Sequence, residues 1–178
     1  MKKILTPQQA AALIPDGASI MFSGFIGCRS PHRVITEIAG QGTKNRTMIC
    51  NDASKANGAD GSDYYGVAEH IHNRQVSRLI ATHVGTNPEV AEQMNAQTLD
   101  VTLIPQGSFA EMIRAGGAGL GGVLTRFCLS YVLPKETSMP RVVQTDFGAY
   151  RAYRRKIRLQ KSPVESFFLR QKNNSDRT

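Results

Sequence analysis

The chain has 178 residues, a formal net charge of +8 and three cysteines, and it contains no run of 18 apolar residues. The length suffices for a buried core, and the missing apolar run excludes a membrane-spanning helix. The apolar run near the N-terminus is also too short for a signal peptide, so we expect a soluble, cytoplasmic protein whose thiols are free.

Charge and glycine content both change at residue 125. Residues 1–125 hold ten Lys and Arg and ten Asp and Glu, whereas residues 126–178 hold twelve and four. Fifteen of the 16 glycines lie in the first segment. Because both properties change at one point, we predict two segments, 1–125 and 126–178, with different roles.

Helices and strands are predicted in alternation over residues 1–125. Thr6-Pro7 is typical of a helix start, with a side-chain cap and a proline in the first turn. A short apolar strand is predicted at 18–22, followed by a glycine-bearing loop and a helix that we expect Ser30-Pro31 to begin. The later strands and helix starts are predicted at 47–50, 76–83, Asn87-Pro88, 100–107 and Ser108. The alternation predicts an α/β fold, with an open parallel sheet and flanking helices.

Two patterns resemble ligand-binding motifs without their context. The run GAGLGG at 117–122 matches G-x-G-x-x-G, but it follows a helical pattern and leads into a strand, the reverse of a dinucleotide-binding loop. We interpret it as a tight turn. The pair His70 and His72 lacks any further ligand motif, so we expect no metal there.

The loop after the first strand has the features of an anion site. Gly24 and Gly27 free its backbone, and the helix that follows directs unpaired N–H groups toward it. Ligands of open parallel sheets bind at the carboxyl ends of the strands. The polar residues that follow strands at this edge, and that we expect to converge near the loop, are Asn51, His83, Asn87 and Gln106.

Four stretches together resemble one family, in its order and spacing. They are DGASIMFSGFIGCRSP (16–31), NDAS (51–54), ATHVGTNPE (81–89) and IPQGSFAEMIRAGGAGLGGVLT (104–125). In these stretches the chain resembles the family I CoA-transferases, in particular the α subunit of the acetate/acetoacetate (3-oxoacid) type. Two residues depart from the family pattern, because Ser23 and Arg29 stand where a glycine is usual.

The resemblance implies a subunit that moves CoA between short-chain carboxylic acids, with acyl-CoA as substrate and no metal, in fatty-acid and ketone-body metabolism. A glutamate attacks the thioester in a ping-pong reaction. In the two-chain members this glutamate lies on a β subunit, so we expect a heterodimer or heterotetramer, no catalytic residue in this chain and no activity of this chain alone. The residues implied to bind CoA are Ser23, Gly24, Phe25, Ile26, Gly27, Cys28 and Arg29, and those implied to position the acyl substrate are Asn51 and Gln106.

Plainer interpretations of several residues stay open. Asn51 could cap a turn, and Gln106 could bond the backbone at a strand end. His83 is more simply a satisfied histidine than a base, and Cys28 a passive rather than a reactive thiol.

Residues 126–178 lie beyond the resemblance. A reading-frame change, or disorder, would leave the α subunit and its sheet incomplete at the C-terminus, with a bare sheet edge. Alternatively the tail is a genuine module, because RAYRRKIRLQK (151–161) interleaves Tyr153 with basic residues, a pattern that can bind nucleic acid. Basic segments are more often only solvated, so we expect neither a nucleic-acid nor a membrane partner.

A third class shares a similar core: sugar-phosphate isomerases and ligand-sensing α/β domains. An isomerase needs an acid–base carboxylate beside its phosphate site. Asp52 is the candidate in this sequence.

Overall fold

The computed structural model describes residues 4–56, 64–120, 122–125, 141–145 and 148–154. They belong to two compact units that divide between Val101 and Thr102. The first unit holds a parallel sheet with helices, and the second holds a helix and an antiparallel sheet. None of the helices in the described ranges has the length and apolar character to span a bilayer.

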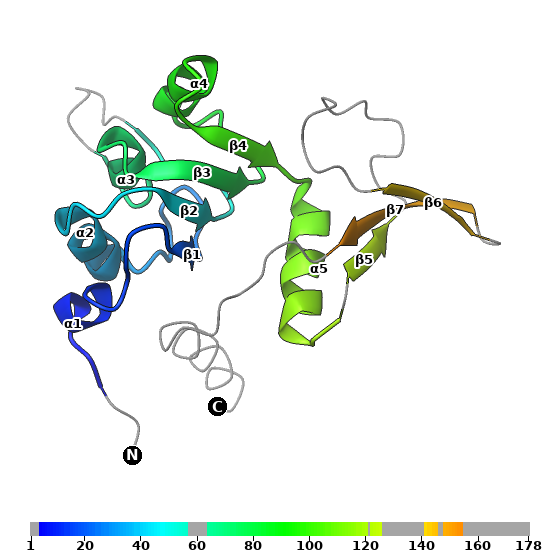
Figure 1. Ribbon diagram of the computed structural model, residues 1–178, viewed down its shortest axis with the longest axis horizontal. Helices are drawn as coiled ribbons and strands as arrows, with labels where there is room; N and C mark the ends of the chain where they lie inside the picture. Colours follow the sequence, from blue (N-terminus) through cyan, green and yellow to red (C-terminus); the bar gives the residue numbers. More distant parts are fainter. Residues whose placement is uncertain (1–3, 57–63, 121, 126–140, 146–147, 155–178) are drawn as a thin grey trace. The chain divides into compact units, whose positions relative to one another are not determined.

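The first unit alternates helices and strands as predicted. Its elements are α1 (Pro7–Ala11), β1 (Ser19–Met21), α2 (His32–Gly40), β2 (Arg46–Ile49), α3 (Ala68–His72), β3 (Val76–Ala81), α4 (Pro88–Asn95) and β4 (Asp100–Leu103), which runs across the division. The strands form one parallel sheet in the order β1-β2-β3-β4 (Figure 1). In its register Ile20 of β1 lies beside Met48 of β2, which lies beside Leu79 of β3. The predicted open parallel α/β fold is confirmed.

The core of this unit lies between the sheet and its helices. Met48 and Leu79 of the strands and Ile35 and Ile38 of α2 have no exposed surface. Full burial of such a side chain contributes about 1.5–3 kcal/mol. The strands are not apolar throughout, because β2 begins with the buried Arg46. Because β1, β2 and β3 pair in parallel, the loops that follow them lie at one edge of the sheet.

Two of the four predicted helix starts are confirmed. Thr6 caps α1 in a capping box, accepting from Gln9 N at 3.2 Å, and Asn87 caps α4. The Ser30 cap is wrong, because α2 begins after Pro31 and Ser30 Oγ donates instead to a loop carbonyl. The Ser108 cap is also wrong, because Ser108 lies buried inside its helix.

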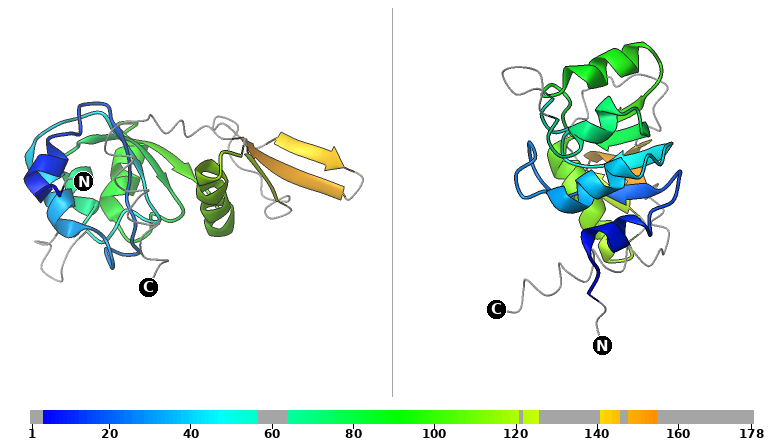
Figure 2. Two further views of the ribbon diagram at one scale, coloured as in Figure 1. Left: turned by 90° about the horizontal axis from the view of Figure 1, so that it is seen from below. Right: turned by 90° about the vertical axis from the view of Figure 1, so that its left-hand side faces the viewer.

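The second unit consists of α5 (Gln106–Gly117), β5 (Gly122–Thr125), β6 (Arg141–Thr145) and β7 (Gly148–Arg154). The strands form an antiparallel sheet in the order β5-β7-β6, and Figure 2 shows the β6–β7 pair. The glycine run ends α5. Gly119 has a φ of 77°, its N–H donates to Gly116 O, and Leu120 N donates to Ala115 O. These bonds form a Schellman motif, so the run is a helix C-terminus before a strand, as interpreted.

Most of the predicted 126–178 segment lies outside the described residues, and with it the reading-frame, disorder and nucleic-acid hypotheses. The described part of the segment is β6 and β7, and β7 pairs with β5, which precedes residue 126. The boundary at residue 125 stays a prediction.

Candidate functional site

The chain forms a tight turn at Phe25–Cys28, shortly after β1. Phe25 N donates to Cys28 O at 3.2 Å, and Cys28 N donates to Phe25 O at 2.9 Å. The two residues between them, Ile26 and Gly27, have φ values of 50° and 78°. Two positive φ values inside such a two-residue loop define a type I′ turn. The glycine-bearing loop is therefore a hydrogen-bonded turn at the carboxyl edge of the sheet.

Ile26 and Gly27 suit this turn differently. Glycine adopts a positive φ without strain, and a Cβ at Gly27 would lie 2.6 Å from Cε1 of Tyr65. Ile26 is β-branched, and a residue held in such a conformation costs on the order of 1–3 kcal/mol. The strain at Ile26 must therefore be offset by contacts from other elements.

Asp52, which follows β2, makes such a contact. Its Oδ2 accepts from the N–H of Ile26 at 2.8 Å, and its Oδ1 accepts from the N–H of Ser54 at 2.7 Å. Only 3% of Asp52 is exposed. Hydrogen bonds to an ionised carboxylate are shorter and stronger than those between neutral groups. One buried carboxylate thus joins the loops that follow β1 and β2.

His32 and Tyr65 hold the other half of the turn. Nε2 of His32, at the start of α2, donates to Gly27 O at 2.8 Å, so this nitrogen carries a proton. The Tyr65 ring lies against Gly27, and its centroid is 4.0 Å from that of the His32 ring. The turn is therefore fixed by α2, by the end of β2 and by the segment before α3.

Asn51 lies beside Asp52 and faces β3. Oγ1 of Thr82 donates to Asn51 O at 2.7 Å and lies 3.1 Å from its Oδ1. The Asn51 amide lies 3.5 Å from Asp52 Oδ2, which is a weak contact. Asn51 therefore lies near the turn, as expected, because the same Asp52 oxygen contacts both the Asn51 amide and Ile26 N–H.

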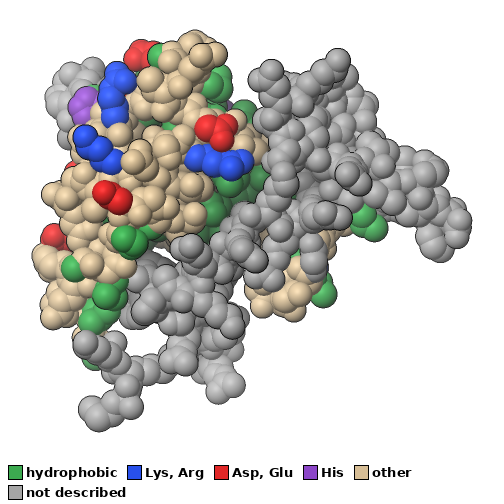
Figure 3. Space-filling model, in the orientation of Figure 1, with side chains coloured by type: hydrophobic (Ala, Val, Ile, Leu, Met, Phe, Trp, Pro, Cys, Tyr) green, Lys and Arg blue, Asp and Glu red, His purple; other side chains and the backbone are tan. Residues whose placement is uncertain are grey.

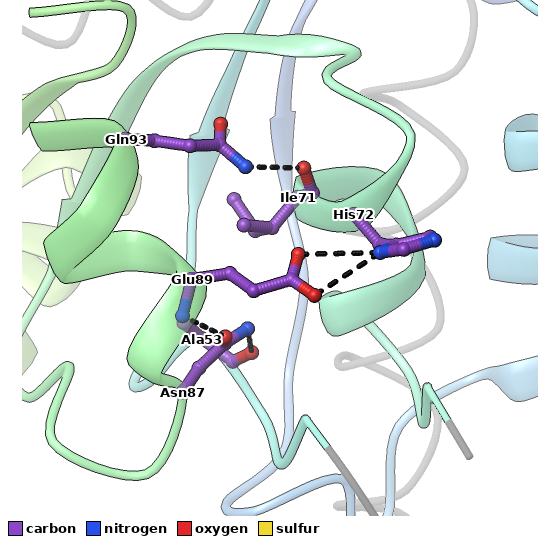
Figure 4. A network of polar contacts seen from close by, with 6 residues as sticks. All are labelled: Ala53, Ile71, His72, Asn87, Glu89 and Gln93. Atoms are coloured by element: carbon purple, nitrogen blue, oxygen red, sulfur yellow. Dashed lines mark hydrogen bonds and ion pairs between the residues drawn. The ribbon is translucent and has the colours of Figure 1, made fainter. Parts of the chain in front are cut away.

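The loop before α4 makes hydrogen bonds to the loop after β2. Asn87 Nδ2 donates to Ala53 O at 3.2 Å, and its Oδ1 accepts from Glu89 N at 3.1 Å (Figure 4). Thr86 Oγ1 donates to Ser54 O at 2.8 Å. Because Asn87 is 1% exposed and both ends of its amide are bonded, it holds the loop after β2 rather than facing a ligand.

The side chains of the turn reach solvent. Ser23, Cys28 and Arg29 are exposed, and 57% of Phe25 is exposed. Arg29 has a φ of 61°, so it occupies a left-handed conformation that a glycine would adopt without strain. The exposed aromatic and cationic side chains make this edge able to contact an extended anionic ligand.

Two cysteines near this edge differ in their exposure to solvent. Cys28 lies exposed on the turn, whereas Cys50 is buried at the end of β2, and both are free. Burial raises the pKa of Cys50 to about 12, and the nearby Asp52 carboxylate adds to the shift. The third cysteine, Cys128, lies outside the described residues.

His83 belongs to the first unit and Gln106 to the second. His83 is exposed after β3, its backbone forms an isolated parallel β-bridge with that of Asp52, and its ring lies close to Gly85. Gln106 is exposed at the start of α5, in the second unit.

His70 and His72 do not face a common site. His70 is fully buried, and its Nδ1 lies 2.9 Å from Nη1 of Arg46. Burial lowers the pKa of His70 to about 4, and the Arg46 charge adds to the effect. His72 is exposed and lies 3.1 Å from the Glu89 carboxylate (Figure 4).

Sequence reasoning missed the roles of Asp52, His32 and Tyr65 in the turn. A local signal existed for one bond, because an aspartate two residues before a backbone donor commonly forms an Asx turn, as Asp52 does with Ser54. No sequence signal joins Asp52 to Ile26, which lies 26 residues away.

Charges on the described surface are mixed. In the view of Figure 3, Lys and Arg side chains lie interspersed with Asp and Glu side chains, without a basic stripe among the coloured residues. This agrees with the balanced charge of residues 1–125.

Comparison of the sequence with known protein families identifies the family of this chain. The family model described as coenzyme A transferase matches residues 4–157, and the chain belongs to this family. The matched range continues past Thr125 and includes β6 and β7.

Several similar proteins are named as α subunits of CoA-transferases. The chain is 44% identical over 124 residues to a probable coenzyme A transferase subunit alpha of Bacillus subtilis, covering 70% of this chain and 51% of the relative. It is 40% identical over 123 residues to the acetate CoA-transferase subunit alpha of Escherichia coli, covering 69% and 53%. The chain thus spans about half the length of the curated relatives it matches.

Solved structures share the fold. An acyl-CoA transferase of Escherichia coli O157:H7 superposes with a TM-score of 0.70 at 19% identity, covering 85% of this chain and 32% of that one. Glutaconate coenzyme A-transferase of Acidaminococcus fermentans superposes with a TM-score of 0.65 at 16% identity, covering 86% and 53%.

Proposed function

We propose that this chain acts as the α subunit of a CoA-transferase that moves CoA between short-chain carboxylic acids. The observation that carries the proposal is the exposed turn at Phe25–Cys28, fixed at the carboxyl edge of a parallel sheet in a member of the coenzyme A transferase family. Relatives are named for acetate, acetoacetyl-CoA and butyrate, which supports short-chain acids as the substrate class.

In this proposal the loop Ser23–Arg29 contacts CoA, and Asn51 and Gln106 orient the acyl group. An amide donates hydrogen bonds without adding charge, which suits a thioester carbonyl whose oxygen becomes negative during attack. The bonds of Asn51 to Thr82 and Asp52 would hold its amide at the edge.

The reaction is proposed to be ping-pong, with the nucleophilic glutamate on a β subunit. Attack of the glutamate on the acyl-CoA breaks the thioester and gives an acyl–glutamyl anhydride and free CoA thiolate. The thiolate then attacks the glutamyl carbonyl of the anhydride, which releases the donor acid as its carboxylate and leaves an enzyme–CoA thioester. The described site supports a nucleophile from elsewhere. The carboxylate that contacts the turn, Asp52, is buried and accepts from two N–H groups, so it is not placed to attack.

The test combines the full chain with the β subunit of a similar acetate CoA-transferase and follows CoA transfer from acetoacetyl-CoA to acetate. We expect transfer only with both chains, parallel double-reciprocal plots, and a CoA adduct on the β subunit alone by mass spectrometry. A CoA adduct on this chain would overturn the assignment of the nucleophile. Failure of the mixture to bind acyl-CoA would overturn the proposed function.

The alternatives receive no support from the described residues. An isomerase would use the Asp52 carboxylate for proton transfer, yet both of its oxygens accept from backbone N–H groups. The basic segment proposed to bind nucleic acid lies mostly outside the described residues.

A further inference from the structure

Two residues near Asp52 share an unusual conformation. Ile26 has a φ of 50° and Ser54 has a φ of 57°, both in the left-handed region that side-chain-bearing residues rarely adopt. They lie in different loops, one after β1 and one after β2. Both donate their N–H to the same carboxylate, Ile26 to Oδ2 and Ser54 to Oδ1 of Asp52.

The strained residue of this pair is Ile26. Serine tolerates the left-handed region better than a β-branched residue does, and Ser54 is also held by its own Oγ, which accepts from Val67 N at 3.3 Å. Asn-Gly is the sequence that a type I′ turn prefers, whereas this turn has Ile-Gly. The turn therefore depends on a contact from outside its own sequence.

We propose that Asp52 is a positioning residue for CoA binding. Its buried carboxylate holds Ile26 in the left-handed conformation and so keeps the Phe25–Cys28 turn in the shape that receives the CoA thioester. The inference rests on the proposed function, since it assigns the cause of the turn's binding shape. Holding the shape before the ligand arrives raises affinity, because less of the binding free energy is used to order the loop.

The geometry makes a neutral substitute inadequate. A carboxylate presents two accepting oxygens, and Asp52 uses both. Asparagine presents one accepting oxygen and one donating NH₂ group. In Asp52→Asn the NH₂ group must therefore face either Ile26 N–H or Ser54 N–H, and two donors cannot form a hydrogen bond. One of the two loops is then released.

The test measures the Kd and KM for acyl-CoA in the complex of this chain with its β subunit. Asp52→Asn should raise both by about tenfold or more, the loss expected for one hydrogen bond to a charged acceptor, with a smaller change in kcat. Asp16→Asn is the matched control, because Asp16 Oδ1 also accepts from a backbone N–H, that of Lys44 at 2.6 Å, before β1 rather than after it. That control should change either constant less than about twofold.

A rescue variant separates positioning from general destabilisation. Ile26→Asn gives the turn its preferred Asn-Gly sequence, so Asp52→Asn should weaken binding much less in the Ile26→Asn background than in the wild type. A merely structural role of Asp52 would give the same loss in both backgrounds, and that result would overturn the proposal.

Ile26→Pro keeps the test valid even where Asp52→Asn fails to fold. Proline removes the N–H and fixes a negative φ, while the buried Asp52–Ser54 bond stays intact. Loss of acyl-CoA affinity is expected. Wild-type affinity in Ile26→Pro or Asp52→Asn, in a complex that binds acyl-CoA, would overturn the positioning role alone, whereas a wild-type complex that binds no acyl-CoA overturns the proposed function.

Discussion

Strand β2 has a buried charged side chain near each end, and the two serve different purposes. Arg46 begins the strand and is fully buried, and Asp52 follows its carboxyl end with 3% exposed. Arg46 donates to Ile38 O in α2 at 2.9 Å and approaches Oε1 of the buried Gln75, just before β3, at 3.3 Å. Asp52 instead accepts from residues in left-handed conformations in two loops.

One strand thus has a hydrogen-bonded, buried cluster at its start and a contact to the strained residue Ile26 after its end. The cluster of Arg46, His70 and Gln75 joins β2 to α2 and α3 through neutral partners, because Gln75 Nε2 also donates to Ala39 O at 2.7 Å. Burial lowers the pKa of Arg46, with the charge of Asp16 partly opposing the shift. We expect this end to determine stability and the Asp52 end to determine binding.

Removing the Arg46 side chain should give the largest loss of stability. Arg46→Ala leaves Ile38 O without its side-chain donor, removes the Arg46 contacts to His70 and Gln75 and opens a cavity, so the free energy of unfolding should fall by at least about 3 kcal/mol. Urea denaturation followed by circular dichroism measures the loss. The control is Arg78→Ala, since Arg78 pairs with Asp100 at 3.2 Å on the surface and should cost less than about 1 kcal/mol. Equal losses would contradict a special role of the cluster.

The same end should give the protein a pH-dependent stability. Burial lowers the pKa of His70 from its usual 6.5 to about 4, so the stability that neutral His70 contributes should fall as pH decreases through this window. The expected loss is about 3 kcal/mol. Unfolding measured across this window in the wild type and in His70→Gln tests it. A variant with the wild-type pH slope would show that other groups cause it.

Asp52→Asn should cost less stability than Arg46→Ala, because one N–H keeps an acceptor and the loops can relax toward solvent. The expected loss is about 1–3 kcal/mol. Hydrogen exchange of the full chain should also quicken in the peptide that contains Ile26, without any ligand present. Unchanged exchange there would show that Asp52 does not hold the turn.

Ile26→Asn should give the smallest effect, and in the opposite direction. Relief of the left-handed strain should raise the free energy of unfolding by up to about 1 kcal/mol. Thermal unfolding measures the gain, with Ile35→Asn in the buried face of α2 as the contrasting loss. A loss at Ile26 larger than about 1 kcal/mol would mean that packing of the isoleucine outweighs its strain.

Sequence patterns predicted correctly the helix starts that depend only on neighbouring residues. The Thr6-Pro7 and Asn87-Pro88 helix starts depend on a cap and a proline a residue apart, and both are present. The Ser30 and Ser108 caps failed because Pro31 and Pro105 precede the actual first residues of α2 and α5. The sequence also gave no signal for α3, whose five residues are too few for a hydrophobic period.

The sequence by itself determined the parallel α/β order, the glycine-bearing loop after β1 and the family, because apolar periodicity and motif spacing are properties of neighbouring residues. Only the tertiary structure decided that Asp52 meets Ile26, that Tyr65 packs against Gly27 and that Arg46 meets His70. These pairs are separated by 24 to 38 residues along the chain. They meet because the pairing of strands in the buried sheet brings distant segments of the chain together, whereas a local pattern reports only on neighbouring residues.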